Sequence, residues 1–214
     1  MYRLDVIETQ AYLDLVDWRS RVGDLYRLGG EGAVRAFRAG RDALFASHPQ
    51  SPIPEADRAE FMGLPYFDAD PAFRFRTRIE PVDDNSEIVI ATAGPDGDIR
   101  YRRAGRLRFD LGGQKCSLTV FWLIGYGGGL FLPFRDATSG KRTYGGGRYL
   151  FDTIKSTYGL ALEVAAGSPE VTIDFNYAYN PSCAYDPHWA CPLAPRENWL
   201  EVPVTAGEKM YGHD

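Results

Sequence analysis

Short runs in which apolar and polar residues alternate, separated by glycine-rich turns, dominate the middle of the chain. In residues 73–80 every second residue is apolar or a threonine and the residues between are charged, which gives a strand one buried and one exposed face. Asp96-Gly97, Gly112-Gly113 and the glycines of residues 125–129 fit tight turns between such strands. Strands this close together favour an antiparallel β-barrel or sandwich. The expected strands lie at residues 73–80, 86–93, 98–103, 107–111, 116–123, 130–134, 160–164, 171–176 and 200–204.

Two helices are expected before the strands. The first runs from residue 4 to the break at Gly29-Gly30, with apolar residues on one side at steps of three and four: Leu4, Ile7, Ala11, Leu15, Trp18, Val22 and Leu25. The second starts at about residue 32 and ends near His48, because the prolines that follow cannot continue it. Its expected buried residues are Val34, Phe37, Leu44 and Phe45.

The length of 214 residues is within the range of one hydrophobic core. We therefore predict a mainly β chain of the α+β class, folded as a single domain over residues 1–214. A helical N-terminal arm (residues 1–48) precedes a β domain (residues 66–214). Residues 177–199 are rich in proline, asparagine and aromatic side chains, which predicts a long ordered loop.

Charge and composition exclude several classes of protein. A net charge of -5 and a pI of about 5.3 give no general attraction to nucleic acid or to anionic lipid. No apolar run approaches the roughly 20 residues that span a bilayer, and the start, MYRLDVIETQ, does not resemble a signal peptide. We therefore expect a soluble, cytoplasmic chain with reduced thiols and with no nucleic-acid or membrane partner.

The first candidate site lies in the glycine-rich residues 133–150. Asp136 and Thr138 fit a turn closed by side-chain hydrogen bonds. The three glycines at 145–147 let a ligand or another backbone approach closely. Arg148 lies between these glycines and Tyr149. It could bind a carboxylate or phosphate, or could instead pair with Asp136 or Asp174. Tyr144 would be a further wall of such a site.

The second candidate site lies on the expected strand at residues 171–176. If Ile173 faces the core, Asp174 and Asn176 share the other face. Buried there, they need partners, which the following loop supplies as Tyr179, Asn180 and Tyr185. Such a network is either structural or holds a carboxyl whose pKa is raised for acid–base work.

The long loop also contains Cys183, His188 and Cys191. Two thiolates and an imidazole would suffice for a catalytic zinc site, but the spacing fits no common metal motif. A reversible disulfide between the two cysteines and a pair of free thiols are the alternatives. Cys116, on an apolar strand, is expected in the core.

The same segments resemble a bacterial and archaeal family, the domain of unknown function number 1684. In the glycine-rich segment the matching residues are Phe134, Asp136, Thr138, Gly140, Thr143, Tyr144, Gly147, Arg148 and Tyr149. In the later strand and loop they are Asp174, Phe175, Asn176, Ala178, Tyr179, Asn180, Pro181, Cys183, Ala184 and Tyr185. Near the end they are Cys191, Pro192, Pro195, Glu197, Asn198, Leu200, Gly207 and Glu208. The resemblance implies no reaction, and His188 lies outside its pattern.

Our hypothesis is a pocket for a small polar or anionic molecule, with no cofactor. Arg148 would anchor an anion, Asp174 and Tyr179 would carry acid–base chemistry, and the other polar residues would bind; these are Asp136, Thr138, Tyr144, Tyr149, Asn176, Asn180 and Tyr185. The alternatives are a non-catalytic structural or interaction domain, and thiol or zinc chemistry at Cys183 and Cys191. The pocket hypothesis requires Arg148 and Asp174 to meet in one hollow.

Overall fold

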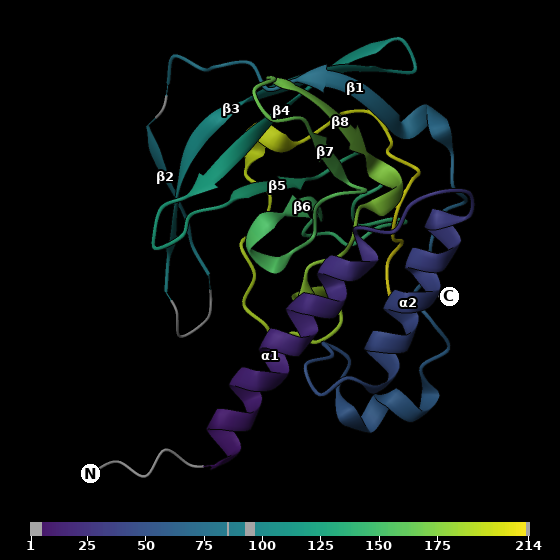
Figure 1. Ribbon diagram of the computed structural model, residues 1–214. Coiled ribbons are helices and arrows are strands. Elements are labelled where there is room, and N and C mark those ends of the chain that lie inside the picture. Colours follow the sequence, from purple (N-terminus) through teal and green to yellow (C-terminus); the bar gives the residue numbers. More distant parts are fainter. Residues whose placement is uncertain (1–5, 85, 93–96, 213–214) are drawn as a thin grey trace.

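The computed structural model describes residues 6–84, 86–92 and 97–212. Two helices, α1 (Val6–Leu25) and α2 (Ala33–Ser47), precede all the strands and lie side by side against one end of them (Figure 1). Asp96, half of a predicted turn, lies outside the described residues.

Helix α2 packs on the core with the face that the sequence predicts. Phe37, Leu44 and Phe45 are buried, whereas Val34 is only half-buried. The helix ends where the N–H of His48 donates to the carbonyl of Leu44. Arg41 is buried on the same face, which the hydrophobic pattern does not predict. A cation at that position requires partners, because an unpaired buried charge is strongly unfavourable.

Helix α1 packs only through its C-terminal half. On the predicted apolar side, Val22 is 3% exposed and Leu15, Trp18 and Leu25 are half-buried, whereas Ala11 is exposed. Leu4 lies outside the described residues. The first turns of α1 extend away from the sheets (Figure 1), so the apolar side predicted along the whole helix is buried only towards its end.

The larger sheet contains five antiparallel strands that follow the order of the chain: β2 (Glu87–Ile90), β3 (Ile99–Leu111), β4 (Gln114–Leu123), β5 (Leu130–Phe134) and β6 (Arg148–Asp152). Strand β3 is one long strand with an irregular register between Arg103 and Gly105, where two strands were predicted. Strand β6 lies in a segment that the sequence indicated only as a turn and a glycine-rich loop.

The smaller sheet brings together the start and the end of the β region. Its three antiparallel strands, in spatial order, are β1 (Arg74–Arg78), β8 (Glu170–Asp174) and β7 (Leu162–Val164). Arg74 lies directly opposite Asp174 in the β1–β8 register. The two sheets form an antiparallel half-barrel, which confirms the predicted α+β fold class.

Short 3₁₀ helices connect these elements: η1 (Glu55–Glu60), η2 (Pro71–Phe73), η3 (Thr153–Lys155), η4 (Phe175–Tyr177), η5 (Ser182–Ala184) and η6 (Arg196–Asn198). The strand predicted at residues 200–204 does not form. Pro203 has no N–H, and the N–H of Val204 donates to the side chain of Asp136, so this stretch cannot complete a ladder. None of the described helices is long and apolar enough to cross a membrane.

Candidate functional site

Arg148, the expected anion anchor, is enclosed by the protein. Its Nη2 pairs with Asp136 Oδ2 at 2.9 Å, and both side chains are 0% exposed. The remaining bonds go to three backbone carbonyls near the end of the chain, those of Val204, Ala206 and Glu208. Burial lowers the pKa of Arg148, and the neighbouring carboxylate of Asp136 offsets part of that effect. This geometry corrects the predicted role, because a ligand cannot reach the guanidinium.

The polar turn beside Arg148 is equally closed. Asp136 Oδ1 accepts from the N–H and the hydroxyl of Thr138 at 2.8 and 2.6 Å and from the N–H of Val204 at 3.1 Å. Gly147 has a φ of 94°, and a Cβ there would lie 2.5 Å from the carbonyl oxygen of Phe134. This glycine therefore serves the close approach of strands β5 and β6 instead of a ligand.

A second buried ion pair, Arg41 with Glu208, was not predicted from the sequence. Arg41 Nη2 lies 2.5 Å from Glu208 Oε1, and the two side chains are 4% and 1% exposed. Glu208 Oε2 accepts from the Tyr185 hydroxyl at 2.5 Å and from the N–H of Asn180 at 2.8 Å. Tyr185 and Asn180, two predicted binding residues, thus belong to a structural network. The available signal was Arg41 itself, four residues after Phe37 on the core-facing side of α2.

Tyr149 and Tyr179 form a third buried group. Tyr149 donates to the carbonyl of Pro192 at 2.6 Å, and the Tyr179 hydroxyl is hydrogen-bonded to Thr157 Oγ1 at 2.8 Å. Burial raises the pKa of Tyr179 well above its ordinary value. Tyr179 lines a cavity of only about 60 Å³ together with Arg41 and Asn180. That volume suits water rather than a metabolite.

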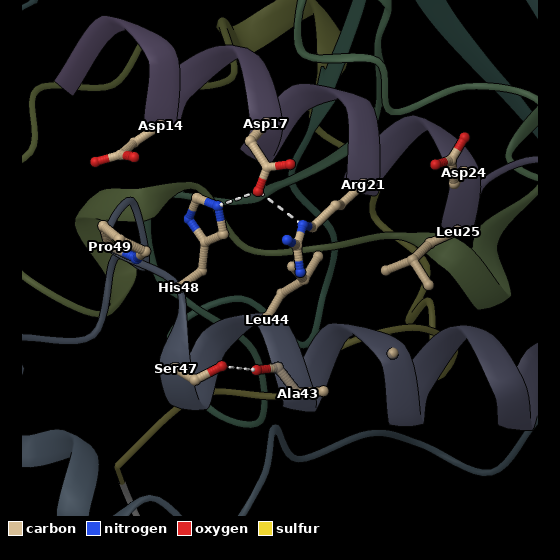
Figure 2. A pocket seen from close by; sticks show the side chains of 11 residues that line it. Asp14, Asp17, Arg21, Asp24, Leu25, Ala43, Leu44, Ser47, His48 and Pro49 are labelled. Carbon is tan, nitrogen blue, oxygen red and sulfur yellow. Dashed lines mark hydrogen bonds and ion pairs between the residues drawn. The ribbon is translucent and has the colours of Figure 1, made fainter. Parts of the chain in front are cut away.

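A larger hollow, of about 530 Å³, lies between α1 and α2 (Figure 2). Its most buried polar side chain, His48, has both ring nitrogens engaged. Nε2 lies 3.0 Å from Asp17 Oδ2, and Nδ1 accepts from the N–H of Gln50 at 3.0 Å. The same Asp17 oxygen pairs with Arg21 Nε at 2.7 Å. No ring nitrogen of His48 is left to act on a ligand, so volume alone does not mark a site.

Asp174 lines a hollow of about 520 Å³ between strand β8, helix η4 and the α1–α2 loop. The residue is 6% exposed. Its Oδ1 accepts from the N–H and the side-chain amide of Asn176 at 2.9 and 2.8 Å, whereas Oδ2 has no hydrogen-bond partner among the described residues. Burial raises the pKa of Asp174, and the two bonds from Asn176 offset part of that effect.

Neighbouring side chains hold this carboxyl group in place. Asn176 donates to the carbonyl of Asp70 at 2.8 Å and accepts from its N–H at 3.0 Å, so the amide cannot turn. At the rim, Arg74 Nη2 lies 2.7 and 2.8 Å from the two carboxylate oxygens of Glu163. The opposite wall contains Gly30 and Gly32, whose φ angles of 83° and 84° favour glycine. Arg74 was predicted only on a charged strand face and Glu163 only within an expected strand, because their meeting depends on strand pairing.

The predicted single site is therefore divided among separate places. Arg148 is enclosed, Tyr179 lines the 60 Å³ cavity, and Asp174 lines the 520 Å³ hollow. The sequence interpretation was wrong in placing Arg148 and Asp174 around one ligand, because the polar groups of the glycine-rich segment bond to the chain's own final residues.

Comparison with known families assigns the chain. The family model described as "Protein of unknown function (DUF1684)" matches residues 59–209, most of the chain. The chain belongs to the DUF1684 family. Among solved structures, it is similar to an uncharacterized protein of Haloarcula marismortui, solved by solution NMR, with 38% identity and a TM-score of 0.61. The match covers 86% of this chain and 96% of that one. No curated protein matches.

In this DUF1684 protein the remaining candidates surround the two loop cysteines. The Tyr144 hydroxyl donates to Cys183 Sγ at 3.6 Å, and the N–H of Cys183 donates to Cys191 Sγ at 3.4 Å. His188 is exposed, and its own N–H donates to Asp186. Within the described part of the chain, no three His, Cys, Asp or Glu side chains are placed to hold a metal ion, so the geometry does not assemble the proposed zinc ligands.

Proposed function

We propose that this chain binds a small polar molecule that presents hydroxyl or amino groups to Asp174. One observation carries the proposal. Asp174 is a buried carboxyl group with one oxygen fixed by Asn176 and the other without a protein partner, at the wall of a 520 Å³ hollow. An unpaired carboxylate oxygen in the wall of a hollow can accept a hydrogen bond from a ligand, and ligand pockets have volumes of roughly 300–1,000 Å³.

The charge around the hollow narrows the class of ligand. Asp70, Glu163 and Asp174 line it together with one arginine, Arg74, which already pairs with Glu163. Three carboxylates against one guanidinium favour a neutral hydrogen-bond donor or a cation over an anion. The proposal therefore retains the polar ligand of our initial hypothesis and omits the anionic one.

The same carboxyl group is suited to proton transfer. Its raised pKa brings protonation closer to neutral pH than for an exposed aspartate, which is the condition for a general acid or base. In an enzymatic version of this function, Asp174 Oδ2 would exchange the proton of the bound hydroxyl or amino group.

The test is an NMR titration of the ¹⁵N-labelled full chain with glycerol, glucose, ethanolamine, spermidine, phosphate and citrate. We expect a polyol, sugar or amine to shift the amide signals of Gly30, Gly32 and Asn176. Asp174→Asn should weaken that binding at least about tenfold, because a hydrogen bond to a charged group contributes about 1.5–3 kcal/mol. Asn can still accept the N–H of Asn176, so the fold should be retained. Asp98→Asn, at an exposed position, is the matched control.

Two results would contradict the proposal. One is binding of equal strength by the Asp174→Asn variant. The other is a spectrum that none of the six compounds changes near the hollow, which is the result expected of a purely structural domain.

A further inference from the structure

Cys183 and Cys191 are neighbours in space, although seven residues separate them in the chain. Cys183 belongs to helix η5, and its backbone N–H donates to Cys191 Sγ at 3.4 Å. Both cysteines are free and partly exposed, whereas Cys116 is buried on β4. The pair is therefore in contact and within reach of solvent.

The hydrogen bonds around the pair are asymmetric. Cys191 Sγ accepts the backbone N–H of Cys183, whereas Cys183 Sγ accepts the Tyr144 hydroxyl. The neighbouring Cys183 side chain lowers the pKa of Cys191 to about 6. The pKa of Cys183 is raised, first by its pairing with Cys191 and then by burial. One cysteine is thus set up as the thiolate and the other as the thiol.

We propose that Cys183 and Cys191 form a redox-active pair that closes a reversible intramolecular disulfide by exchange with low-molecular-weight disulfides. The hydrogen bond from the Cys183 N–H to Cys191 Sγ, which brings the two cysteines together, and the access of both to solvent carry this proposal. It is independent of the Asp174 hollow.

The exchange proceeds in two displacements. The Cys191 thiolate attacks one sulfur of a disulfide R–S–S–R, which breaks that bond, forms Cys191–S–S–R and releases RS⁻. Cys183 then loses its proton to solvent, and its sulfur attacks Cys191 Sγ and expels the second RS⁻. Two protein thiols have lost two electrons and two protons, and one small disulfide has become two thiols.

The pair favours this chemistry over metal binding. A zinc site needs at least three protein ligands, and no third such ligand stands beside the two sulfurs among the described residues. Thiol exchange requires only a thiolate that solvent can reach and a second thiol beside it.

The experiment equilibrates the full chain with reduced and oxidised glutathione in graded ratios. Each sample is quenched in acid and denatured, and its thiols are labelled with a maleimide polymer that retards the chain on a gel. The wild type has three cysteines, so we expect a transition from three labelled thiols to one. Cys116→Ser, the matched control, should pass from two labelled thiols to none at the same ratio. Peptide mass spectrometry of the oxidised wild type should identify the Cys183–Cys191 link without any variant.

Variants of the two cysteines test which sulfur attacks the small disulfide first. Cys183→Ser keeps the attacking thiolate but has no second thiol, so it should accumulate a glutathione adduct on Cys191. Cys191→Ser should form less adduct, because burial still raises the pKa of Cys183 in that variant. The proposal is overturned if the wild type keeps three labelled thiols in excess oxidised glutathione, or if the oxidised protein contains a link to Cys116 instead.

Discussion

Arg148 and Asp174 are both buried charged side chains at the ends of strands, but their surroundings differ in one respect. The Arg148 guanidinium is bonded to Asp136 and to three backbone carbonyls, all from the chain itself. The Asp174 carboxyl group is held at one oxygen only, and its other oxygen belongs to the wall of a hollow. Burial of a charge therefore does not mark a binding site in this protein. The distinguishing feature is where the unbonded polar atom lies, because Arg148 Nε is enclosed by the protein whereas Asp174 Oδ2 lies at the wall of a hollow.

The largest effect is expected at the enclosed group. Arg148→Ala leaves Asp136 buried without its cation and three carbonyls without a donor, so the free energy of unfolding should fall by about 3–5 kcal/mol. Urea denaturation followed by circular dichroism measures this loss. Arg102→Ala, at an exposed position, should change the same quantity by no more than about 0.5 kcal/mol. A stable Arg148→Ala variant would remove the contrast between the two regions.

A smaller effect, with a defined dependence on pH, is expected at the open group. Because the folded pKa of Asp174 is raised, its ionised form costs stability above that pKa. The cost is relieved as the pH falls through the folded pKa towards the ordinary value of 3.8, since the folded state takes up the proton first. Asparagine does not titrate.

The stability of Asp174→Asn relative to the wild type should therefore be highest near neutral pH and should decrease at about pH 4. Urea denaturation of both proteins at the two pH values measures the difference. A difference that is the same at both would show that the Asp174 environment does not disfavour its charge.

The smallest effect is expected at the rim of the hollow. Glu163 and Arg74 are 45% and 48% exposed, so Glu163→Gln should lower the free energy of unfolding by about 0.5 kcal/mol or less. Glu170→Gln, which breaks the exposed pair with Arg76 on the same sheet, is the matched control. A stability loss above about 1 kcal/mol for Glu163→Gln, without a similar loss for Glu170→Gln, would show that the rim pair stabilises the fold as the enclosed Arg148 network does.

The fold was predictable wherever local pattern decides it. The alternation around Phe75 and the prolines after His48 are local signals, and strand β1 and the end of α2 lie where they indicate. Strand β6 was missed because its five residues are all buried and show no alternation. The strand expected near Val202 failed because Pro203 and the side chain of Asp136 compete with a ladder there.

The candidate site was predictable in its residue types but not in its grouping. Asp174 and Asn176, two residues apart, were expected on one face of a strand, and their side chains do form a hydrogen bond. The residues that face them are set by the strand register that pairs Arg74 with Asp174, one hundred residues apart in the chain. No local sequence pattern encodes that register. The pairing of Arg148 with Asp136, twelve residues away, was one of the alternatives that the sequence left open.

The ion pair between Arg41 and Glu208 bears on how the protein is synthesised. These residues are separated by 167 positions, and Arg148 is capped by carbonyls of the same late segment. When the nascent chain has emerged only as far as strand β8, Glu208 and the carbonyls that bond to Arg148 are still inside the ribosome. Arg41 and Arg148 then lack these partners. The buried hydrogen bonds of Arg41 and Arg148 can therefore be completed only after residue 208 has left the exit tunnel, so the final packing of helix α2 should be a late step in synthesis.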